Sequence, residues 1–385
     1  MEQLMEQMET VNKDVGMYKN FVRFGDLFDY ENKSKIKAGE GLAVGEYPFY
    51  TSSSVLSKFL DDYTFDKTSL IFGTGGNASI HYCESPFSVS TDCLVVFAKD
   101  ETICFPKFVF YYLFGNINLL EEGFKGAGLK HISKGFINDL EIPLPPLPIQ
   151  KRIAEILDAA DALKRKDQEL LKKYDELAQA IFIDMFGDPV KNEKGWETKK
   201  FQELGTLDRG VSKHRPRNAS ELLGGKYPLI QTGDVANSGG IITKYRSTYS
   251  EIGLKQSKMW SKGTLCITIA ANIAKTGILD FDACFPDSIV GFKPNDKVSN
   301  SVFVKFWIGF LQKILEDNAP ESAQKNINLE ILRGLDVICP PVELQNKFEK
   351  IIEQLNLVKS SNSNFEADNL FQTLIQKAFK GELVK

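Results

Sequence analysis

The chain has 385 residues, which is too long for one typical hydrophobic core and predicts at least two domains. It is 43% hydrophobic and 25% charged, as ordinary globular proteins are, and its formal net charge of −4 excludes a uniformly basic nucleic-acid binder. No segment reaches the roughly 18 apolar residues of a membrane-spanning helix. The polar, acidic start MEQLMEQMETVNKD does not have the pattern of a signal peptide. We therefore expect a cytoplasmic protein without a membrane partner.

The cysteines and histidines do not form a pattern typical of disulfide bonds or metal sites. Six cysteines are present without any CxxC pair, and only three histidines occur in the chain. In a protein without an export signal, such cysteines are expected to be reduced, buried thiols. The histidines have no neighbour at metal-ligand spacing, so the sequence predicts no metal site.

The first part of the chain predicts a domain of short strands and helices. A helical segment is expected over residues 1–20, before the domain itself over residues 21–148. Short β-branched and aromatic runs such as DCLVVFA predict strands, and FPKFVFYYLFGNINLLEEG predicts a helix. The mixture indicates the α+β class.

A proline-rich junction follows the first domain. In PLPPLP, residues 143–148, three prolines stand within the first four positions. Proline lacks a backbone donor and holds the preceding residue in extended geometry. The junction therefore predicts a stiff exit from the domain, with a long helix over residues 149–187 beyond it.

The second part of the chain repeats the first. Residues 68–97, TSLIFGTGGNASIHYCESPFSVSTDCLVVF, align with residues 263–292, GTLCITIAANIAKTGILDFDACFPDSIVGF, at an offset of 195. The junction returns at the same offset as LDVICPPVELQNKF. The repeat predicts a second similar domain over residues 195–341 and a second long helix over residues 342–385. A period of this length describes two copies of a domain-plus-helix unit rather than a solenoid.

The two copies differ in charge. Residues 21–148 contain 11 basic and 16 acidic residues, a net of −5. Residues 195–341 contain 19 basic and 15 acidic residues, a net of +4. The overall net charge therefore hides a local asymmetry, and a nucleic-acid surface confined to part of the chain is compatible with it.

Both long helices carry a heptad pattern. The first seam consists of Ile149, Ile153, Ile156, Ala160, Leu163, Asp167, Leu170, Tyr174, Leu177 and Ile181. The second consists of Leu344, Phe348, Ile351, Leu355, Val358, Asn362 and Phe365. Because no other long amphipathic helix is available, we expect the two helices to pack on each other as an antiparallel coiled coil, a rod of roughly 50 Å.

These motifs resemble a known family. EIPLPPLPIQKRIAEILDAAD, the IFIDMFGDP that closes the first helix and the C-terminal QKAFKGEL are similar to the specificity subunits of type I restriction–modification systems. KGFINDLEIPLPPLPIQ, preceded by GAGLKHIS, is close to the family pattern, and the likeness covers nearly the whole chain. The second copy departs from it, because ICPPVELQNKF lacks the first proline and the Pro-Ile-Gln start.

The resemblance implies a DNA-recognition subunit that is not catalytic by itself. Each domain would read one half of a split site on double-stranded DNA, and the helices would set the spacing. Two modification subunits would dock on the helices and bring the restriction subunits with them. No cofactor is expected on this chain, since S-adenosylmethionine, ATP and magnesium would belong to the partners. Because the copies differ, we expect an asymmetric bipartite target.

Basic and polar loops are the candidate DNA contacts. Arginine can pair bidentately with guanine, and lysine or arginine can pair with phosphate. The serines, threonine and glutamine stand at probable strand ends, where capping a turn is an equally good reading. The candidates are Lys33, Lys35, Lys37, Ser52, Ser53 and Lys130 in the first domain and Arg209, Lys213, His214, Arg215, Arg217, Gln231, Thr232 and Lys325 in the second.

Other functions have weaker support. GTGGN, residues 73–77, lacks the GK[ST] ending of a phosphate loop and is better read as a tight turn. No adenine-methyltransferase motif of the NPPY type occurs, and no histidine has triad spacing. Basic residues 164–166, 172 and 173 on the first long helix are either solvated or part of a docking face. The main alternative is a coiled-coil adaptor that binds protein partners without DNA specificity.

Overall fold

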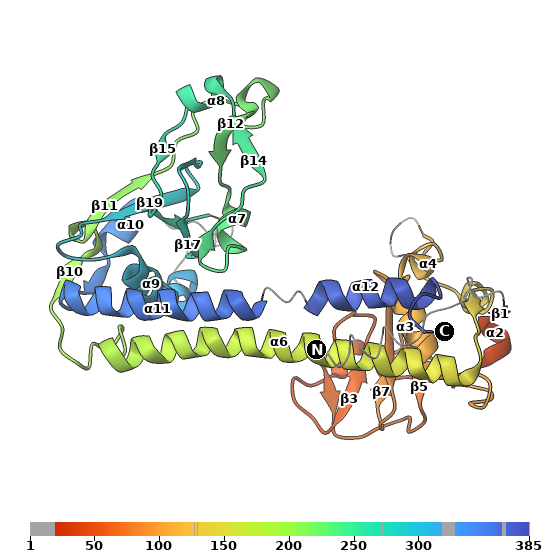
Figure 1. Cartoon of the computed structure of the whole chain (residues 1–385). Coiled ribbons are helices and arrows are strands. Elements are labelled where there is room, and N and C mark those ends of the chain that lie inside the picture. Colours follow the sequence, from red (N-terminus) through yellow and green to blue (C-terminus); the bar gives the residue numbers. More distant parts are fainter. Residues whose placement is uncertain are drawn as a thin grey trace. The chain divides into compact units, whose positions relative to one another are not determined.

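The computed structural model describes residues 20–126, 128, 130–270, 273–317, 328–363 and 367–384 (Figure 1). The chain forms two compact units, one made of residues 1–169 and 363–385 and the other of residues 170–362. The helix predicted over residues 1–20 falls almost wholly outside the described residues. Within that description, none of the helices has the length and apolarity that crossing a membrane demands.

The first unit is built on a four-stranded antiparallel sheet with the order β2-β8-β5-β6. A three-stranded sheet, β4-β3-β7, and a short ladder, β1-β9, complete its strands. The strands are β1 (Phe21–Arg23), β2 (Phe28–Tyr30), β3 (Tyr47–Tyr50), β4 (Phe59–Leu60), β5 (Ser69–Gly73), β6 (Ser79–Cys83), β7 (Ser88–Val89), β8 (Cys93–Ala98) and β9 (Glu141–Pro143). The helices are α2 (Phe24–Leu27), η1 (Ala38–Glu40), α3 (Pro106–Gly115), α4 (Asn118–Glu121), α5 (Lys134–Asn138), α12 (Ala367–Phe379) and the first part of α6 (Leu147–Phe186).

The second unit repeats this topology and adds one strand to each of the two larger sheets, β13 and β15. Its main sheet has the order β11-β19-β16-β17-β13, beside a sheet β14-β12-β18-β15 and a ladder β10-β20. The strands are β10 (Thr198–Lys200), β11 (Gly205–Arg209), β12 (Leu223–Leu229), β13 (Ile241–Ile242), β14 (Ser247–Tyr249), β15 (Met259–Trp260), β16 (Leu265–Thr268), β17 (Thr276–Leu279), β18 (Ala283–Cys284), β19 (Ile289–Pro294) and β20 (Asp336–Ile338). The helices are η2 (Phe201–Glu203), η3 (Ser220–Leu222), α7 (Thr232–Ala236), α8 (Glu251–Lys255), α9 (Ser301–Asp317), α10 (Leu329–Gly334), α11 (Val342–Ser363) and the rest of α6.

The duplication predicted from the sequence is confirmed, and with it the α+β class. The central strands β5 and β16 are buried along their whole lengths, as expected of apolar strands in the middle of a sheet. The caps before α5 and α10 also correspond: Ser133 Oγ accepts from Phe136 N at 3.2 Å, and Asn328 Oδ1 accepts from Ile331 N at 2.8 Å. Both pairs of residues are 195 positions apart.

A buried glutamine joins each long helix to the domain that precedes it. Gln150 is fully buried, and its Nε2 donates to Ile103 O at 2.9 Å and to Pro145 O at 2.8 Å. Its Oε1 accepts from Phe105 N at 2.8 Å. The side chain thus ties the proline junction to the loop before α3. Helix α6 begins at Leu147, two residues earlier than predicted, because a proline in the first turn loses no helical hydrogen bond.

The second junction has the same construction. Gln345 is fully buried, donates to Val298 O at 2.9 Å and Pro340 O at 2.8 Å, and accepts from Asn300 N at 3.3 Å. Every partner lies 195 positions beyond its counterpart at Gln150. The junction is therefore conserved in structure between the two copies, although its proline pattern differs.

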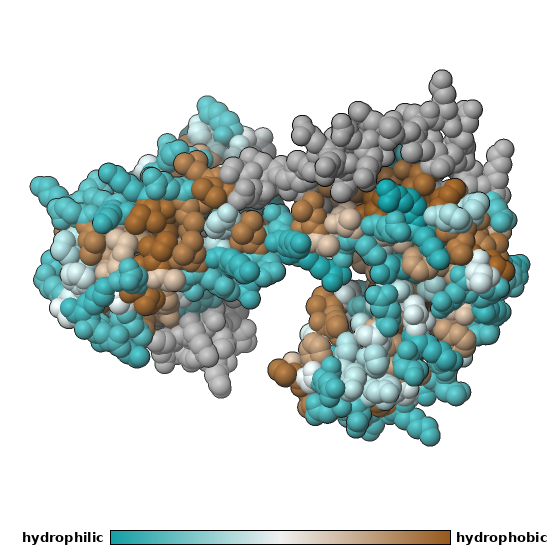
Figure 2. Space-filling model, turned by 60° about the horizontal axis from the view of Figure 1, so that its bottom comes forward, coloured by the Kyte–Doolittle hydropathy of each residue, from teal (hydrophilic) through white to brown (hydrophobic). Residues whose placement is uncertain are grey.

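The inward face of α6 differs from the predicted seam at every second position. Ile153 and Ala160 are buried as predicted, but Leu163, Leu170 and Leu177 are 42%, 37% and 47% exposed. Hydrophobic side chains accordingly reach the surface among hydrophilic ones (Figure 2). Consecutive side chains are rotated by about 100° around the helix axis. At these three places the side chain that points toward the domain is that of the following residue.

Some of the residues at the inward positions are small or charged, so a search for a hydrophobic pattern does not select them. Leu157 and Ala178 are buried, and Lys164 lies against α12, where its Nζ is 2.6 Å from Asp368 Oδ1 and 5.5 Å from the centre of the Phe371 ring. Lys164 therefore does not belong to an outer docking face. In α11 the same shift makes Ile352 the buried residue in place of the predicted Ile351. The seam side chains at residues 362 and 365 lie outside the described ones.

Within the second unit, α11 runs antiparallel to the second part of α6 (Figure 1). Asp175 Oδ1 lies 2.6 Å from Lys359 Nζ, whereas Phe182, further along α6, packs on Phe348, nearer the start of α11, with ring centres 5.5 Å apart. Both phenylalanines are fully buried and share one core with Phe303 of α9. Full burial of such a side chain contributes about 1.5–3 kcal/mol. The helix pair is thus part of the domain core.

Replacing either junction glutamine by alanine is expected to destabilise its unit. Gln150→Ala leaves one backbone N–H and two carbonyls without their hydrogen-bond partner, and Gln345→Ala does the same in the second unit. We expect each to lower the free energy of unfolding by about 1–3 kcal/mol, measured by urea unfolding.

The control is Gln168→Ala, at an exposed position of α6. It should change the free energy of unfolding by no more than about 0.5 kcal/mol. Equal effects of all three substitutions would show that the glutamine junction does not hold helix and domain together.

Candidate nucleic-acid interface

In the first unit, the turn at Thr91 and Asp92 connects the segments that hold the candidate residues. The Asp92 carbonyl accepts from Ser52 Oγ at 2.6 Å and from the N and Oγ1 of Thr74 at 2.8 and 2.9 Å. Thr91 N donates to Ile36 O at 2.8 Å. One turn between β7 and β8 therefore holds three loops that are far apart in the sequence.

The three lysines of the first loop point away from the domain. Lys33, Lys35 and Lys37 are exposed, whereas Ser34 is buried and Ile36 is partly buried. An extended backbone places alternate side chains on opposite sides, which explains the pattern. Within the described residues no ion pair holds these lysines, so their charges are available to a phosphate backbone.

The two serines have different roles. Ser52 Oγ donates to the Asp92 carbonyl and accepts from Gly75 N at 3.4 Å. The hydroxyl therefore makes its hydrogen bonds within the unit itself. Ser53 is exposed; its Oγ accepts from Val55 N at 3.1 Å and its carbonyl accepts from His81 Nε2 at 2.8 Å. Burial lowers the pKa of His81 below its ordinary value of 6.5. Ser52 thus orders the loop, and Ser53 is the one presented to solvent.

The segment that contains Lys130 is bonded to the Thr74 loop, in part by the neighbouring His131. His131 Nδ1 donates to Thr74 O at 3.1 Å, and Lys130 O accepts from Gly76 N at 3.3 Å. The backbones of His131 and Lys125 exchange two hydrogen bonds of 3.1 Å. Lys125 and Lys130 are both exposed. GTGGN is therefore a turn that supports a basic segment, as the sequence indicated.

In the second unit, the loop that follows β11 is anchored on two sides. Gly210 N donates to Ile289 O at 2.8 Å and Val211 N to Phe285 O at 3.1 Å. On the other side Ser257 Oγ donates to Val211 O at 2.7 Å. The turn at residues 284–289 corresponds to residues 89–94 of the first unit, so both units use the same turn to hold a candidate loop.

A glutamine side chain holds the next part of the loop. Gln256 Oε1 accepts from Lys213 N at 2.6 Å and His214 N at 3.0 Å. His214 Nε2 lies 3.6 Å from Glu221 Oε1. Lys213 is exposed and makes no ion pair within the described part of the chain. Among these residues, Lys213 is the cation most open to a phosphate.

The arginines of this loop converge on Asp287. Arg217 Nη2 lies 2.6 and 2.9 Å from the two Asp287 carboxylate oxygens, and Arg215 Nη2 lies 3.8 Å from Oδ2. Arg209 Nε donates to Asp287 O at 2.8 Å. Arg215 also donates from Nη1 to two carbonyls of its own loop, at 2.7 and 2.8 Å. Part of each guanidinium is therefore engaged within the unit, and the sequence did not indicate these contacts.

Gln231 and Thr232 stand at the start of α7. Gln231 is exposed, and its N donates to Asp234 Oδ2 at 2.9 Å, which is a capping arrangement. Ile230 N donates to Cys284 O at 2.9 Å, so this segment is also held by the turn at residues 284–289. Lys325, the remaining candidate, lies outside the described residues.

Several contributors were missed in the sequence. Lys258 Nζ and Arg333 Nη2 each lie 3.4 Å from a carboxylate oxygen of Asp208, beside the arginine loop. The two organising residues, Asp92 and Asp287, were also missed. The signal for them was present, since STDCL and FPDSI place an aspartate at the same position of the repeat.

Metal-ligating and nucleophilic side chains were compared among the described residues. They include no group of three or more His, Cys, Asp or Glu side chains able to hold a metal ion. All six cysteines are free, and burial raises the pKa of Cys93 to about 11 and of Cys104 to about 12, which disfavours the nucleophilic thiolate. His81 and His131 are bonded to backbone carbonyls rather than to a Ser or Cys nucleophile.

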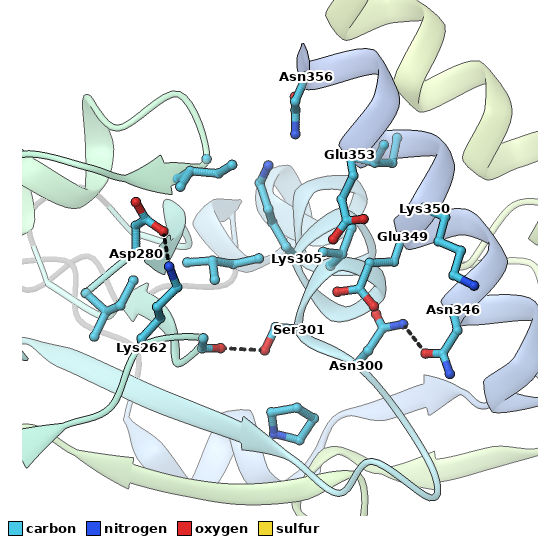
Figure 3. A pocket seen from close by; sticks show the side chains of 18 of the residues that line it. Lys262, Asp280, Asn300, Ser301, Lys305, Asn346, Glu349, Lys350, Glu353 and Asn356 are labelled. Atoms are coloured by element: carbon cyan, nitrogen blue, oxygen red, sulfur yellow. Dashed lines mark hydrogen bonds and ion pairs between the residues drawn. The ribbon is translucent and has the colours of Figure 1, made fainter. Parts of the chain in front are cut away.

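A cavity of about 660 Å³ in the second unit lies between α11, the start of α9 and the strand ends of the main sheet (Figure 3). Glu349, Glu353 and Lys305 line it. Burial, together with the Glu353 and Asp296 carboxylates, raises the pKa of Glu349 above its ordinary value of 4.5, and burial lowers that of Lys305. None of the candidate DNA-contacting residues lines this cavity, so we do not assign it to the interface.

The chain belongs to the family of type I restriction–modification DNA specificity proteins, whose domain model matches it twice, over residues 18–173 and 193–364. The EcoBI specificity subunit of Escherichia coli is 26% identical over 370 residues, covering 86% of this chain and 77% of the relative. The Escherichia coli EcoDI specificity subunit is 23% identical over 402 residues, covering 94% and 88%.

Solved structures share the fold. The S subunit of a type I restriction–modification system from M. genitalium aligns with a TM-score of 0.63 at 16% identity, covering 96% of this chain and 98% of that one. A chain from a structure of type I R-M complex assembly and conformational transition aligns with a TM-score of 0.52 at 17% identity, covering 97% and 100%. The two-domain fold with long helices is therefore that of specificity subunits.

Glu349→Gln is expected to stabilise the second unit at neutral pH. Because the folded state raises the pKa of this carboxyl, it binds the proton more tightly than the unfolded state does, and stability falls as the pH rises from 4.5 through the folded-state pKa. The cost is therefore greater at pH 7 than at pH 4. The substitution should raise the melting temperature at pH 7 and leave it almost unchanged at pH 4.

Glu343→Gln is the matched control, since Glu343 lies in the first turn of the same helix, where a negative charge is favourable. It should lower the melting temperature slightly at pH 7. A similar loss with Glu349→Gln at pH 7 would contradict the assignment of a raised pKa.

Proposed function

We propose that this specificity subunit reads an asymmetric bipartite site on double-stranded DNA, with one half-site for each compact unit. The observation that carries the proposal is the repeated turn at Asp92 and Asp287, which holds exposed polar and basic loops in both units. The same framework presents different side chains: lysines and serines in the first unit, arginines and a glutamine in the second. Different side chains on one framework would read different bases.

The helices would set the distance between the half-sites. Helix α6 has 40 residues and passes through both units, which corresponds to roughly 60 Å of continuous helix. Half-sites read from one face of B-DNA lie about 34 Å, one helical turn, apart or at multiples of it. A single helix that enters both domain cores is suited to hold such a spacing.

The chemistry would belong to other subunits. The described residues provide no metal cluster and no activated thiol, so we propose that the chain does not methylate or cut DNA by itself. Two modification subunits, and through them restriction subunits, would join it in a cytoplasmic complex and supply S-adenosylmethionine, ATP and magnesium. The relatives are themselves subunits of type I restriction enzymes, which supports such partners.

The adaptor alternative predicts a different response to salt. A protein that neutralises phosphates releases counterions, so its affinity for duplex DNA falls steeply as the salt concentration rises. An adaptor that binds only proteins would show no such DNA binding. The exposed lysines at residues 33, 35, 37, 130 and 213 favour the first behaviour.

The proposal predicts that the two half-sites can be exchanged separately. Replacing residues 170–362, the second compact unit, by the matching segment of a relative with another target should change one half-site and leave the other unchanged. The boundary matters because Phe182, Phe186 and Phe348 share a core with the second domain, so an exchange of residues 195–341 alone would join unmatched cores. The measurement is a methylation map of the assembled complex.

The reciprocal exchange of the first compact unit, residues 1–169 and 363–385, is the control and should change the other half-site, because α6 and α12 share the core of the first domain. A transplant of either segment that alters both half-sites would rule out independent reading by the two units.

A further inference from the structure

Asp287 holds more cationic side chains than any other acid of the interface described above. Its carboxylate accepts two hydrogen bonds from Arg217 and lies 3.8 Å from Arg215, and its carbonyl accepts from Arg209. The three arginines come from the end of β11 and the loop after it. One residue therefore contacts three guanidinium groups in the second unit.

The corresponding residue of the first unit works in another way. Asp92 uses its carbonyl to hold two neutral side chains, those of Ser52 and Thr74. Its own side chain is exposed and takes part in no ion pair within the described portion of the chain. The first unit thus uses only neutral hydrogen bonds at this residue, whereas the second unit adds charged contacts from arginines to the Asp287 carboxylate.

The ion pair at Asp287 is too exposed to matter much for stability. The Arg217 and Asp287 side chains are 46% and 35% exposed, and pairs of this kind usually contribute little to folding. Their effect is geometric, because Arg217 Nη2 donates to both carboxylate oxygens of Asp287, and these charge-assisted hydrogen bonds hold that end of the guanidinium in place. Arginine has five N–H donors, so Arg217 keeps donors for DNA while two of its hydrogen bonds go to Asp287.

We propose that Asp287 is a specificity-determining positioning residue of the second unit, which holds Arg215 and Arg217 in the orientation that reads DNA. The proposal rests on the DNA-recognition function proposed above. Three arginines and one aspartate give this cluster a net charge of +2. Removing the carboxylate raises that charge to +3, so specific reading should weaken while attraction to any duplex is kept or increased.

The test compares Asp287→Asn with the wild-type chain, both assembled with their modification subunits. Methylation is mapped on a duplex library with both half-sites randomised, and binding to an unrelated duplex is measured across salt concentrations. We expect Asp287→Asn to lose roughly tenfold of its preference at one or two base pairs of the half-site read by the second unit. The other half-site should stay unchanged, and binding to the unrelated duplex should be at least as tight as before.

Asp336→Asn is the matched control. Asp336 lies on β20 and forms an exposed ion pair with Lys200 at 2.8 Å, so the substitution makes the same charge change in the same unit away from the arginine loop. It should leave both half-sites unchanged. This comparison separates the effect of net charge from the effect of arginine orientation.

Arg217→Lys is a second variant, which keeps the charge but loses the planar fork. It should relax the same half-site without any gain in binding to the unrelated duplex. If Asp287→Asn and Arg217→Lys both retain the wild-type motif, or relax both half-sites equally, Asp287 does not position the reading arginines. If the wild-type complex itself shows no bipartite motif, the proposed function fails and this inference falls with it.

Discussion

The buried glutamine after each proline junction is the interaction on which the architecture depends. Gln150 and Gln345 each stand one turn inside a long helix and hold three backbone groups of the domain before it. A buried amide that loses such partners is costly, so the helix cannot leave the domain at another angle without breaking all three bonds. The prolines reduce the freedom of the exit, and the glutamine determines where the helix starts.

The recognition loops also depend on a few interactions made by one short segment. A single turn, at Asp92 in one unit and at Asp287 in the other, holds several loops that are distant in the sequence. Because the framework is hydrogen-bonded mainly through backbone groups, the side chains on the loops can differ between the units. The net charges of −5 and +4 over the two domains show how far they have diverged. A duplicated framework with unlike loops would be the structural basis for the proposed asymmetric target.

Much of the fold followed from the sequence, and the reasons for the exceptions are physical. The duplication was visible because buried strands such as β5 and β16 keep apolar residues in constant register. The helix seam was assigned one residue off at alternate positions, because Leu163 and Leu177 are more hydrophobic than the adjacent Lys164 and Ala178. The inward face depends on contacts with domain side chains that no local sequence pattern contains. The candidate loops were found by charge, but the commitment of Arg217 to Asp287 was not, because the two residues are 70 positions apart.

We propose that helix α6, which enters both domain cores, sets the spacing between the half-sites together with α11 and α12, each of which enters one core. Asp167 and Asn362 lie close to the boundaries between the two compact units. Inserting seven residues near each of them lengthens both helices by about 10 Å and leaves the residues of both cores unchanged. Since B-DNA rises about 3.4 Å per base pair, methylation mapping on a library of spacers should show a preferred spacer longer by roughly one to three base pairs, with both half-sites unchanged. A variant that still prefers the original spacer would show that the helices do not set the distance.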